Sequence, residues 1–327
     1  MIKINNQKII FFIRLIIFIL IIYFIYAELN KYTIELASLN DRFKINFFIL
    51  AIIFFVIANL IGTYNNYIIV ILLRKIKLFY FSKIVWTGQL LDFFPFLGLV
   101  YKAKKLKDKI QLSYKKFLAI YIFLFKISIF ALSTYLVIYY ILPLKKNLNI
   151  NVVIFYSFFI IFTSIIILLL FNKFFILFFR KKKFSISLFK KKINLLIIFS
   201  IFLFILRKAL LRNYTYLKCY ALSLLANFSS FICFFLIFKT YQLDVSYIDA
   251  FLIYLLLVFS TQIPILPKNY GYAELIGSYL IQLSSENFVT GFSVMITLRI
   301  ISLISTLLLF TIFNINWFKN KLNDQKK

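Results

Sequence analysis

One carboxylate and one guanidinium near the C-terminal end of the chain are the side chains best placed to do chemistry. Glu274 follows the segment Pro264–Gly271, in which two prolines and a glycine interrupt an apolar stretch. Such a break is tolerated inside a membrane only where protein or a water-filled cavity surrounds it. Arg299 lies about 25 residues further on, within the next apolar run. Opposite charges beside a broken helix are typical of a substrate or ion site in a membrane protein.

A second interruption lies in the first half of the chain. Asp92, Pro95 and Gly98 break the apolar stretch Ile84–Val100, and Lys102 opens a densely basic segment. Basic flanks on both sides favour a re-entrant hairpin, which enters and leaves the membrane at one face. The alternative is an amphipathic helix lying in the membrane interface.

The chemistry open to these residues is limited. The chain has no histidine, so it lacks the commonest general base and zinc ligand, and we expect neither a cofactor nor a metal. Glu274 could contact a lipid headgroup, carry a proton or pair with Arg299. Because an unpaired carboxylate at bilayer depth is costly, we expect the pair to form. Lys126, within another apolar run, is a candidate partner for Asp92.

The composition places these residues in a membrane protein. Of the 327 residues, 63% are hydrophobic, and apolar runs of about 20 residues recur, as in transmembrane helices. The net charge of +29 would suggest a nucleic-acid partner in a soluble protein. Here the lysines cluster between apolar runs, so they mark cytoplasmic loops and contacts with anionic lipid, and we expect no nucleic acid.

We therefore predict an all-α polytopic bundle that forms one integral membrane domain over residues 1–327. Its halves are about 1–150 and 151–318, with a basic tail at 319–327. The bundle has two re-entrant broken-helix segments and an arrangement consistent with an inverted repeat. About eight spans are expected, namely Ile9–Ala27, Ile45–Leu73, Phe117–Leu142, Val152–Phe171, Ile193–Leu211, Tyr216–Phe238, Ala250–Leu266 and Phe288–Phe313. The piece Leu275–Leu283 is only half the length of a span.

The lysine and arginine distribution predicts the orientation. With eight spans both termini lie on one side, and the basic bias places them in the cytoplasm. The loops 102–116 and 173–192 and Lys239 are then cytoplasmic, and the loops 28–44, 143–151 and 207–218 lie outside. Neither re-entrant segment, 84–101 or 264–283, is expected to cross.

Both interruptions carry a resemblance to a known family. The sequence resembles the flippase-like membrane proteins that include the transmembrane region of lysylphosphatidylglycerol synthases, over roughly residues 45–313. The second-half signature of that family corresponds to Pro267, Asn269, Gly271, Glu274 and Arg299. The first-half signature, a proline break followed by a basic helix, corresponds to Pro95, Gly98, Lys102, Ala103, Leu106 and Lys107.

The resemblance implies that these residues, together with Asp92, contact a polar-headed lipid during translocation. We predict a flippase for a lipid or a lipid-linked sugar in the cell (cytoplasmic) membrane, acting on lipids with anionic or polar headgroups. The alternative is a non-catalytic membrane subunit that supports an envelope glycosyltransferase. Lysyl-transferring members add a soluble catalytic domain after their spans, whereas this chain ends soon after its last apolar run. We therefore expect a transporter and not an enzyme.

Overall fold

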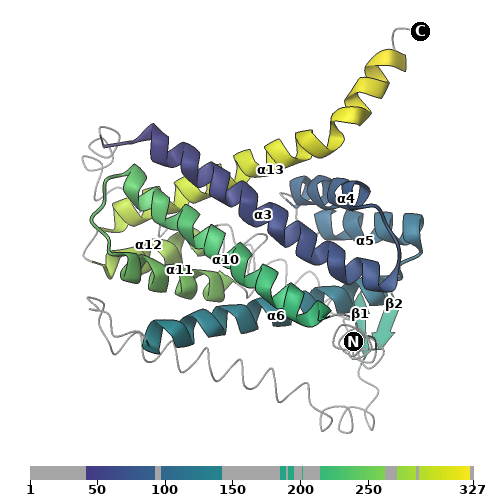
Figure 1. The fold of residues 1–327 in the computed structure, drawn as a ribbon, viewed down its shortest axis with the longest axis horizontal. Helices are drawn as coiled ribbons and strands as arrows, with labels where there is room; N and C mark the ends of the chain where they lie inside the picture. The colour runs from purple at the N-terminus through teal and green to yellow at the C-terminus, as the bar shows by residue number, and fades with distance from the viewer. Residues whose placement is uncertain are drawn as a thin grey trace, which may run out of the picture.

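The computed structural model describes residues 42–92, 97–141, 185–188, 191–194, 201, 214–261, 271–284 and 287–324. Helices dominate these residues, as the sequence predicts (Figure 1). They are α3 (Ile45–Leu73), α4 (Leu78–Leu91), α5 (Leu97–Ile110), α6 (Tyr114–Ile141), α10 (Thr215–Thr240), α11 (Tyr247–Thr261), α12 (Tyr272–Gln282) and α13 (Phe288–Asp324). Two short strands, β1 (Ser185–Leu188) and β2 (Lys191–Asn194), pair antiparallel.

Four helices in this part of the chain are long and apolar enough to cross a membrane. They are α3, α6, α10 and the first 27 residues of α13, and they confirm four of the predicted spans. The predicted spans Ile9–Ala27 and Val152–Phe171 lie outside the described residues. Most of the predicted span Ile193–Leu211 does so too, but β2 occupies its first two residues, where Ile193 is paired with Ile186 of β1.

The surface of α3 is suited to lipid. Ile45, Ile49 and Ile53 are each about half exposed on this helix, at spacings that follow one of its faces. An exposed aliphatic stripe of this length is unfavourable in water and favourable against hydrocarbon. The helix therefore faces the bilayer along much of its length.

Polar contacts fix the direction of α10 relative to α3. The Lys44 amide donates to the Thr240 carbonyl oxygen at one end of the pair (2.8 Å). Further along, the Asn65 side-chain amide donates to the Cys219 carbonyl oxygen (3.1 Å) and to Ser223 Oγ (2.9 Å). The two helices are therefore antiparallel. Hydrogen bonds between helices in a membrane contribute about 0.6 kcal/mol each on average, so Asn65 helps to set the register of this pair.

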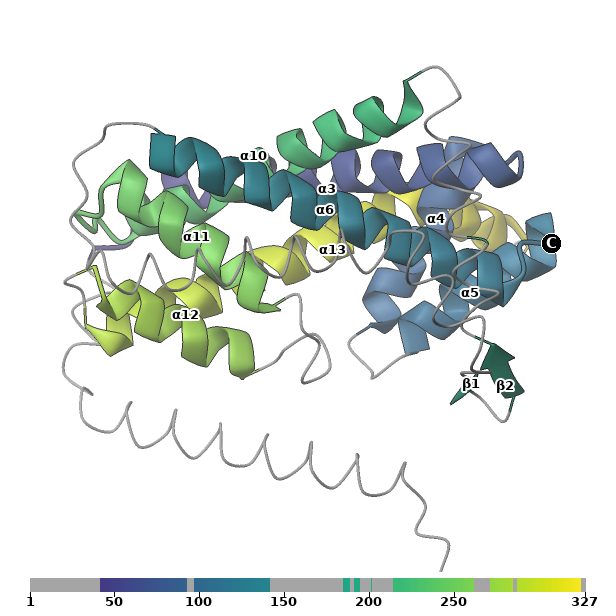
Figure 2. The same cartoon turned by 90° about the horizontal axis from the view of Figure 1, so that it is seen from below.

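Two helical hairpins complete the described bundle, α4 with α5 and α11 with α12 (Figures 1 and 2). Their arms have 14, 14, 15 and 11 residues. At 1.5 Å per residue each arm is about 17–22 Å long, which is less than the hydrocarbon thickness of about 30 Å. No arm can cross the bilayer alone, which agrees with the prediction of two re-entrant segments.

The hairpins enter the bundle from opposite ends. The α4–α5 hairpin begins where α3 ends, and the α11–α12 hairpin begins where α10 ends. Because α3 and α10 are antiparallel, these starting points lie at opposite ends of the molecule, as Figure 2 shows. Each hairpin has its own cluster of buried apolar side chains, one centred on α10–α13 and one on α4, α5 and α6.

This arrangement corrects two predictions about the second half. The predicted span Ala250–Leu266 is wrong as a crossing helix, because its hairpin returns to the end from which it started. The end of α12 leads into α13, where Thr297 hydrogen-bonds to Tyr241 beside the start of α11, whereas Phe313 further along α13 packs on Phe79 at the opposite end. The chain thus crosses one time fewer after α10 than predicted. Independently of this, the hydrogen bond from the Lys44 amide to the Thr240 carbonyl oxygen puts Thr240 at the same end as Lys44, so placing the loops beside these residues on opposite faces of the membrane was also wrong.

The corrected order improves the separation of charge. Lys218, at the start of α10, lines a surface hollow together with Lys75 and Lys77, so it belongs to the end where α3 finishes. That end also carries the segment 74–116, which holds eleven lysines and arginines. The predicted outer loop 207–218 had left four basic residues on the less basic face. Lys218, the one of them that the structure describes, lies at the basic end instead.

Labelling of single cysteines tests this order. With Cys219 and Cys233 replaced by alanine, Lys44→Cys and Gln242→Cys should react with a membrane-impermeant maleimide from one face. Ser113→Cys and Lys218→Cys should react from the other face, since these exposed residues lie at the opposite end of the bundle. Labelling of Lys44→Cys and Gln242→Cys from opposite faces would restore the eight-span order and contradict the hairpin arrangement.

Candidate functional site

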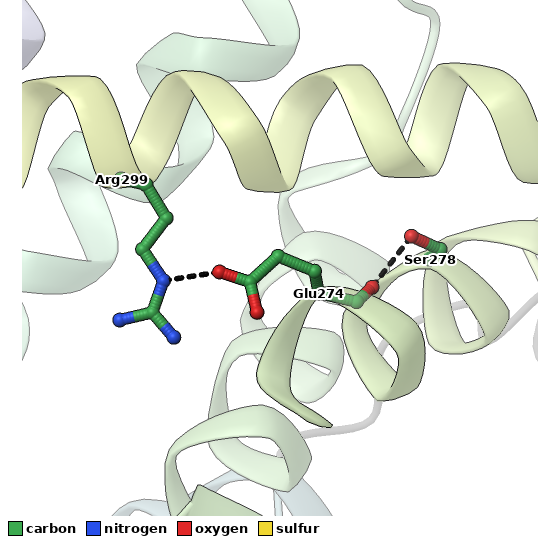
Figure 3. Close-up of polar contacts among 3 residues, drawn as sticks. All are labelled: Glu274, Ser278 and Arg299. Atoms are coloured by element: carbon green, nitrogen blue, oxygen red, sulfur yellow. Dashed lines mark hydrogen bonds and ion pairs between the residues drawn. The ribbon is translucent and has the colours of Figure 1, made fainter. Parts of the chain in front are cut away.

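An ion pair joins the second hairpin to α13. Arg299 Nε donates a hydrogen bond to Glu274 Oε1, and the Glu274 side chain is only 6% exposed (Figure 3). Glu274 lies in the first turn of α12, where the unpaired N–H groups and the helix dipole favour a negative charge. The prediction that these two residues lie close together inside the bundle is confirmed.

The carboxylate of Glu274 retains unused bonding capacity. Its Oε2 atom is buried and has no hydrogen-bond partner among the described residues. The nearby Ser278 hydroxyl does not serve it, because that hydroxyl donates to the Glu274 backbone carbonyl oxygen (2.6 Å, Figure 3). A buried acceptor without a donor is costly, so this oxygen is a ready acceptor for a ligand, a water or a proton.

Small residues bring α12 close enough to α13 for this pair to form. A Cβ atom added at Gly291 of α13 would lie 2.7 Å from the Ser278 carbonyl oxygen of α12. A Cβ atom at Gly277 would lie 2.3 Å from the sulfur atom of Met295. Glycine contacts of this kind let helix backbones approach closely in membranes, and here they place Arg299 within reach of Glu274.

The residue that starts α12 needs to be glycine. Gly271 has φ +77° and ψ −46° at the N-cap position of the helix. Side chains of L-residues are strained at this φ, whereas glycine adopts it readily. Gly271 therefore turns the chain into α12, whose first turn carries Glu274. The predicted site residues Pro267 and Asn269 lie outside the described residues.

The first hairpin contains a second ion pair. Lys102 Nζ lies 2.8 Å from Asp92 Oδ2, and Lys102 is buried. The two residues come from opposite arms, since Asp92 ends α4 and Lys102 lies in α5. The proposed pairing of Asp92 with Lys126 is therefore wrong, because the returning arm brings a closer cation. Pro95 lies outside the described residues.

Gly98 explains how the arms of this hairpin come together. A Cβ atom there would lie 2.0 Å from the Gly88 carbonyl oxygen and 2.2 Å from Asp92 Oδ1. Gly88 in turn lies against the aliphatic stem of Lys102. Three predicted site residues therefore lie in one contact between the arms, namely Asp92, Gly98 and Lys102. Gly88, which the sequence analysis did not single out as a site residue, is part of the same contact.

A cavity of about 430 Å³ lies beside Arg299. Its lining is largely apolar, with uncharged polar side chains at a few positions, as in small-molecule sites. Sequence reasoning missed the polar residues of this lining. Polar side chains three residues apart in an apolar helix share one face, and such pairs could have indicated a polar face on α10 and α13. The polar residues of the lining are Asn227 and Ser230 of α10, Thr261 of α11, and Ser302 of α13 next to Arg299.

Fold and site together define a polytopic helical membrane protein with two charged, inward-reaching hairpins. The chain belongs to the family described as the lysylphosphatidylglycerol synthase TM region, whose model matches residues 11–309. This confirms the family that the two interrupted segments indicated. The matched model describes the membrane region of these synthases and not a catalytic domain. No curated protein and no solved structure matches the chain.

The close approach of α4 and α5 predicts a sharp effect of one methyl group. Gly98→Ala should push the arms apart and lower the thermal stability of the purified protein, because the new Cβ would overlap backbone and carboxylate atoms. Gly62→Ala in α3 is the matched control, since nothing lies within 4 Å of its added Cβ. The control should be neutral or stabilising by about 0.5–1 kcal/mol. Equal unfolding temperatures for both variants would contradict the contact.

The Glu274–Arg299 pair predicts a non-additive result. Arg299→Ala should destabilise the protein by about 3–5 kcal/mol, because it leaves a buried carboxylate without its cation. The double variant Glu274→Gln/Arg299→Gln should recover much of the folded yield, measured as monodisperse protein after size-exclusion chromatography. If the double variant folds no better than Arg299→Ala, the pair is not energetically coupled.

Proposed function

We propose that this protein is a flippase of the cell (cytoplasmic) membrane that moves a polar-headed lipid or a lipid-linked sugar between leaflets. The observation that carries the proposal is the ion pair of the buried Glu274 with Arg299. The pair leaves one carboxylate oxygen spare and lies next to a largely apolar cavity with a few polar side chains. Ionisable groups inside a membrane bundle are expensive and mark substrate or ion pathways in most membrane proteins.

The two hairpins supply a route from both faces. Transporters with inverted repeats use interrupted helices from each half, and their substrate sites lie near the middle of the bilayer. In this chain one short hairpin enters from each end, and each carries a carboxylate near its break that pairs with a cation, Lys102 of the same hairpin or Arg299 of α13. Such an arrangement suits alternate exposure of a central site to the two leaflets.

The chemistry of the second pair suits a lipid headgroup. A guanidinium is the side chain that best matches the paired oxygens of a phosphate. The spare Oε2 of Glu274 can accept a hydrogen bond from an ammonium or hydroxyl group of the same headgroup. A headgroup with both a phosphate and such donors would satisfy both partners while it passes through the protein.

Charge separation supports an orientation for transport. Eleven basic residues lie in the segment 74–116 at one end of the bundle, and the described residues at the other end include only Arg42, Lys44 and Lys239. Under the positive-inside rule, the basic end faces the cytoplasm. The C-terminal end of α13 lies there as well, so we place the C-terminus in the cytoplasm, and we keep the sequence-based expectation of a cytoplasmic N-terminus.

A reconstituted assay tests the proposal. Proteoliposomes with a fluorescent phospholipid should show protein-dependent loss of the protected inner-leaflet signal after dithionite is added, and Glu274→Gln should abolish this movement. Asp249→Asn is the matched control, because Asp249 is also a buried carboxylate in the first turn of its arm but bonds to Ser246. The control should retain movement.

Two results would overturn the proposal. Movement at the wild-type rate in Glu274→Gln would remove this residue from the pathway. No movement of any tested lipid by the wild-type protein, together with copurification of an envelope glycosyltransferase, would favour the non-catalytic membrane subunit instead.

A further inference from the structure

A second cavity, of about 390 Å³, lies near the basic end of the molecule, and none of the ion-pair residues lines it. It is bounded by α4, α5 and α13, which lie near one another at that end in Figure 1. The aromatic rings of Phe79 in α4 and Phe313 in α13 pack 5.5 Å apart beside it. This contact holds the start of α4 against α13, so packing between the helices fixes two walls of the cavity.

The side chains that line the cavity come from single stripes on the three helices. Tyr80, Lys83 and Thr87 recur at spacings of three and four residues along α4. Tyr101 and Lys105 are four residues apart on α5. The polar groups of these stripes are donors for an anion, and no carboxylate is among the described residues that line the cavity.

The third stripe, on α13, adds an amide. Asn314 is buried and lies four residues after Phe310, which also lines the cavity. On the opposite wall, the Thr87 hydroxyl oxygen is buried and has no hydrogen-bond partner among the described residues. The cavity therefore combines two ammonium groups with neutral hydrogen-bonding groups, one of them unsatisfied.

The depth of the cavity matches a headgroup region. Lys83 is the sixth residue of α4, about 8 Å along the helix from its start at Leu78. The start of α4 follows the basic residues Arg74, Lys75 and Lys77, which mark the membrane surface. Basic pockets between helices at the cytoplasmic side of membrane proteins are typical sites for phosphate-bearing lipid headgroups.

We infer that this cavity, between Lys83 and Lys105, binds the phosphate of an anionic lipid headgroup from the leaflet at the basic end. The inference deepens the proposed function, on which it rests, because it names the headgroup chemistry that the protein collects before translocation. Lys105 lies over the ring of Tyr101 (5.9 Å), which orients its ammonium group on this wall. The Glu274–Arg299 site is distinct, since none of its residues lines this cavity.

Lipid binding to the full chain in detergent tests this inference, with native mass spectrometry as the readout and phosphatidylglycerol as the probe. Lys83→Gln/Lys105→Gln should weaken binding by about thirtyfold, because each ammonium near a membrane surface contributes about five- to sixfold. Lys104→Gln/Lys109→Gln removes the same charge from positions of α5 that do not line the cavity and is the matched control. The control should bind within about twofold of the wild type. Equal losses in both double variants, or no loss in either, would overturn the inference.

Further arms separate the sources of the phosphate and the two proposals. If millimolar inorganic phosphate fails to displace phosphatidylglycerol, the lipid is the ligand; displacement at matched concentrations would overturn the assignment to a lipid. Glu274→Gln should bind phosphatidylglycerol as the wild type does. If the wild type binds phosphatidylglycerol but moves no lipid, the flippase proposal alone is wrong. If Lys83→Gln/Lys105→Gln binds phosphatidylglycerol as the wild type does and lipid movement is normal, this inference alone is wrong.

Discussion

The Glu274 carboxylate, buried among apolar helices, constrains the whole second half of the molecule. A charge at this depth requires a cation, and Arg299 of α13 supplies it. For the two side chains to meet, α12 must begin inside the bundle and lie close to α13. The φ of Gly271 allows the start, and Gly277 and Gly291 allow the approach. Three glycines therefore determine where the pair forms, through the backbone conformation and the helix spacing that they allow.

The first half meets a similar constraint with different connections. Its ion pair links the two arms of one hairpin, Asp92 of α4 to Lys102 of α5, whereas the second pair links a hairpin to a crossing helix. In both halves a glycine-lined contact accompanies the pair. The two hairpins are thus comparable in length and charge but not equivalent in detail. A lysine, which is more strongly hydrated than arginine, holds the first pair, so the two sites are not expected to respond alike to substrate.

Much of this arrangement was predictable because it depends on local signals. The length of the apolar run Ile45–Leu73 equals that of α3, and the Pro and Gly interruptions marked both hairpins. Spacing in the sequence and the cost of a buried charge also indicated the Glu274–Arg299 pair. The direction of the second hairpin was not predictable from length alone. The apolar run Ala250–Leu266 is nearly long enough to span, and only contacts between distant segments, such as that of Tyr241 with Thr297 of α13, show that the hairpin returns instead.

Contacts between distant segments carry the remaining information. Lys102 and Lys126 were both reasonable partners for Asp92, and only the approach of α5 to α4 distinguishes them. Similarly, the cavity beside Arg299 gathers polar side chains from three helices, none of which carries a recognisable motif. Sequence periodicity indicates which face of a helix is polar, but not which helices bring their polar faces together.

The most direct test of the central interaction is the protonation state of Glu274, measured by infrared difference spectroscopy between the wild type and Glu274→Gln in lipid. An ion pair with Arg299 predicts the stretching bands of an ionised carboxylate in the wild type. The same comparison in an Arg299→Gln background should show the carbonyl band of a protonated acid instead, because a lone buried carboxylate is neutralised. A protonated Glu274 in the wild type, or an ionised one that does not respond to the loss of Arg299, would contradict the pair on which the second half depends.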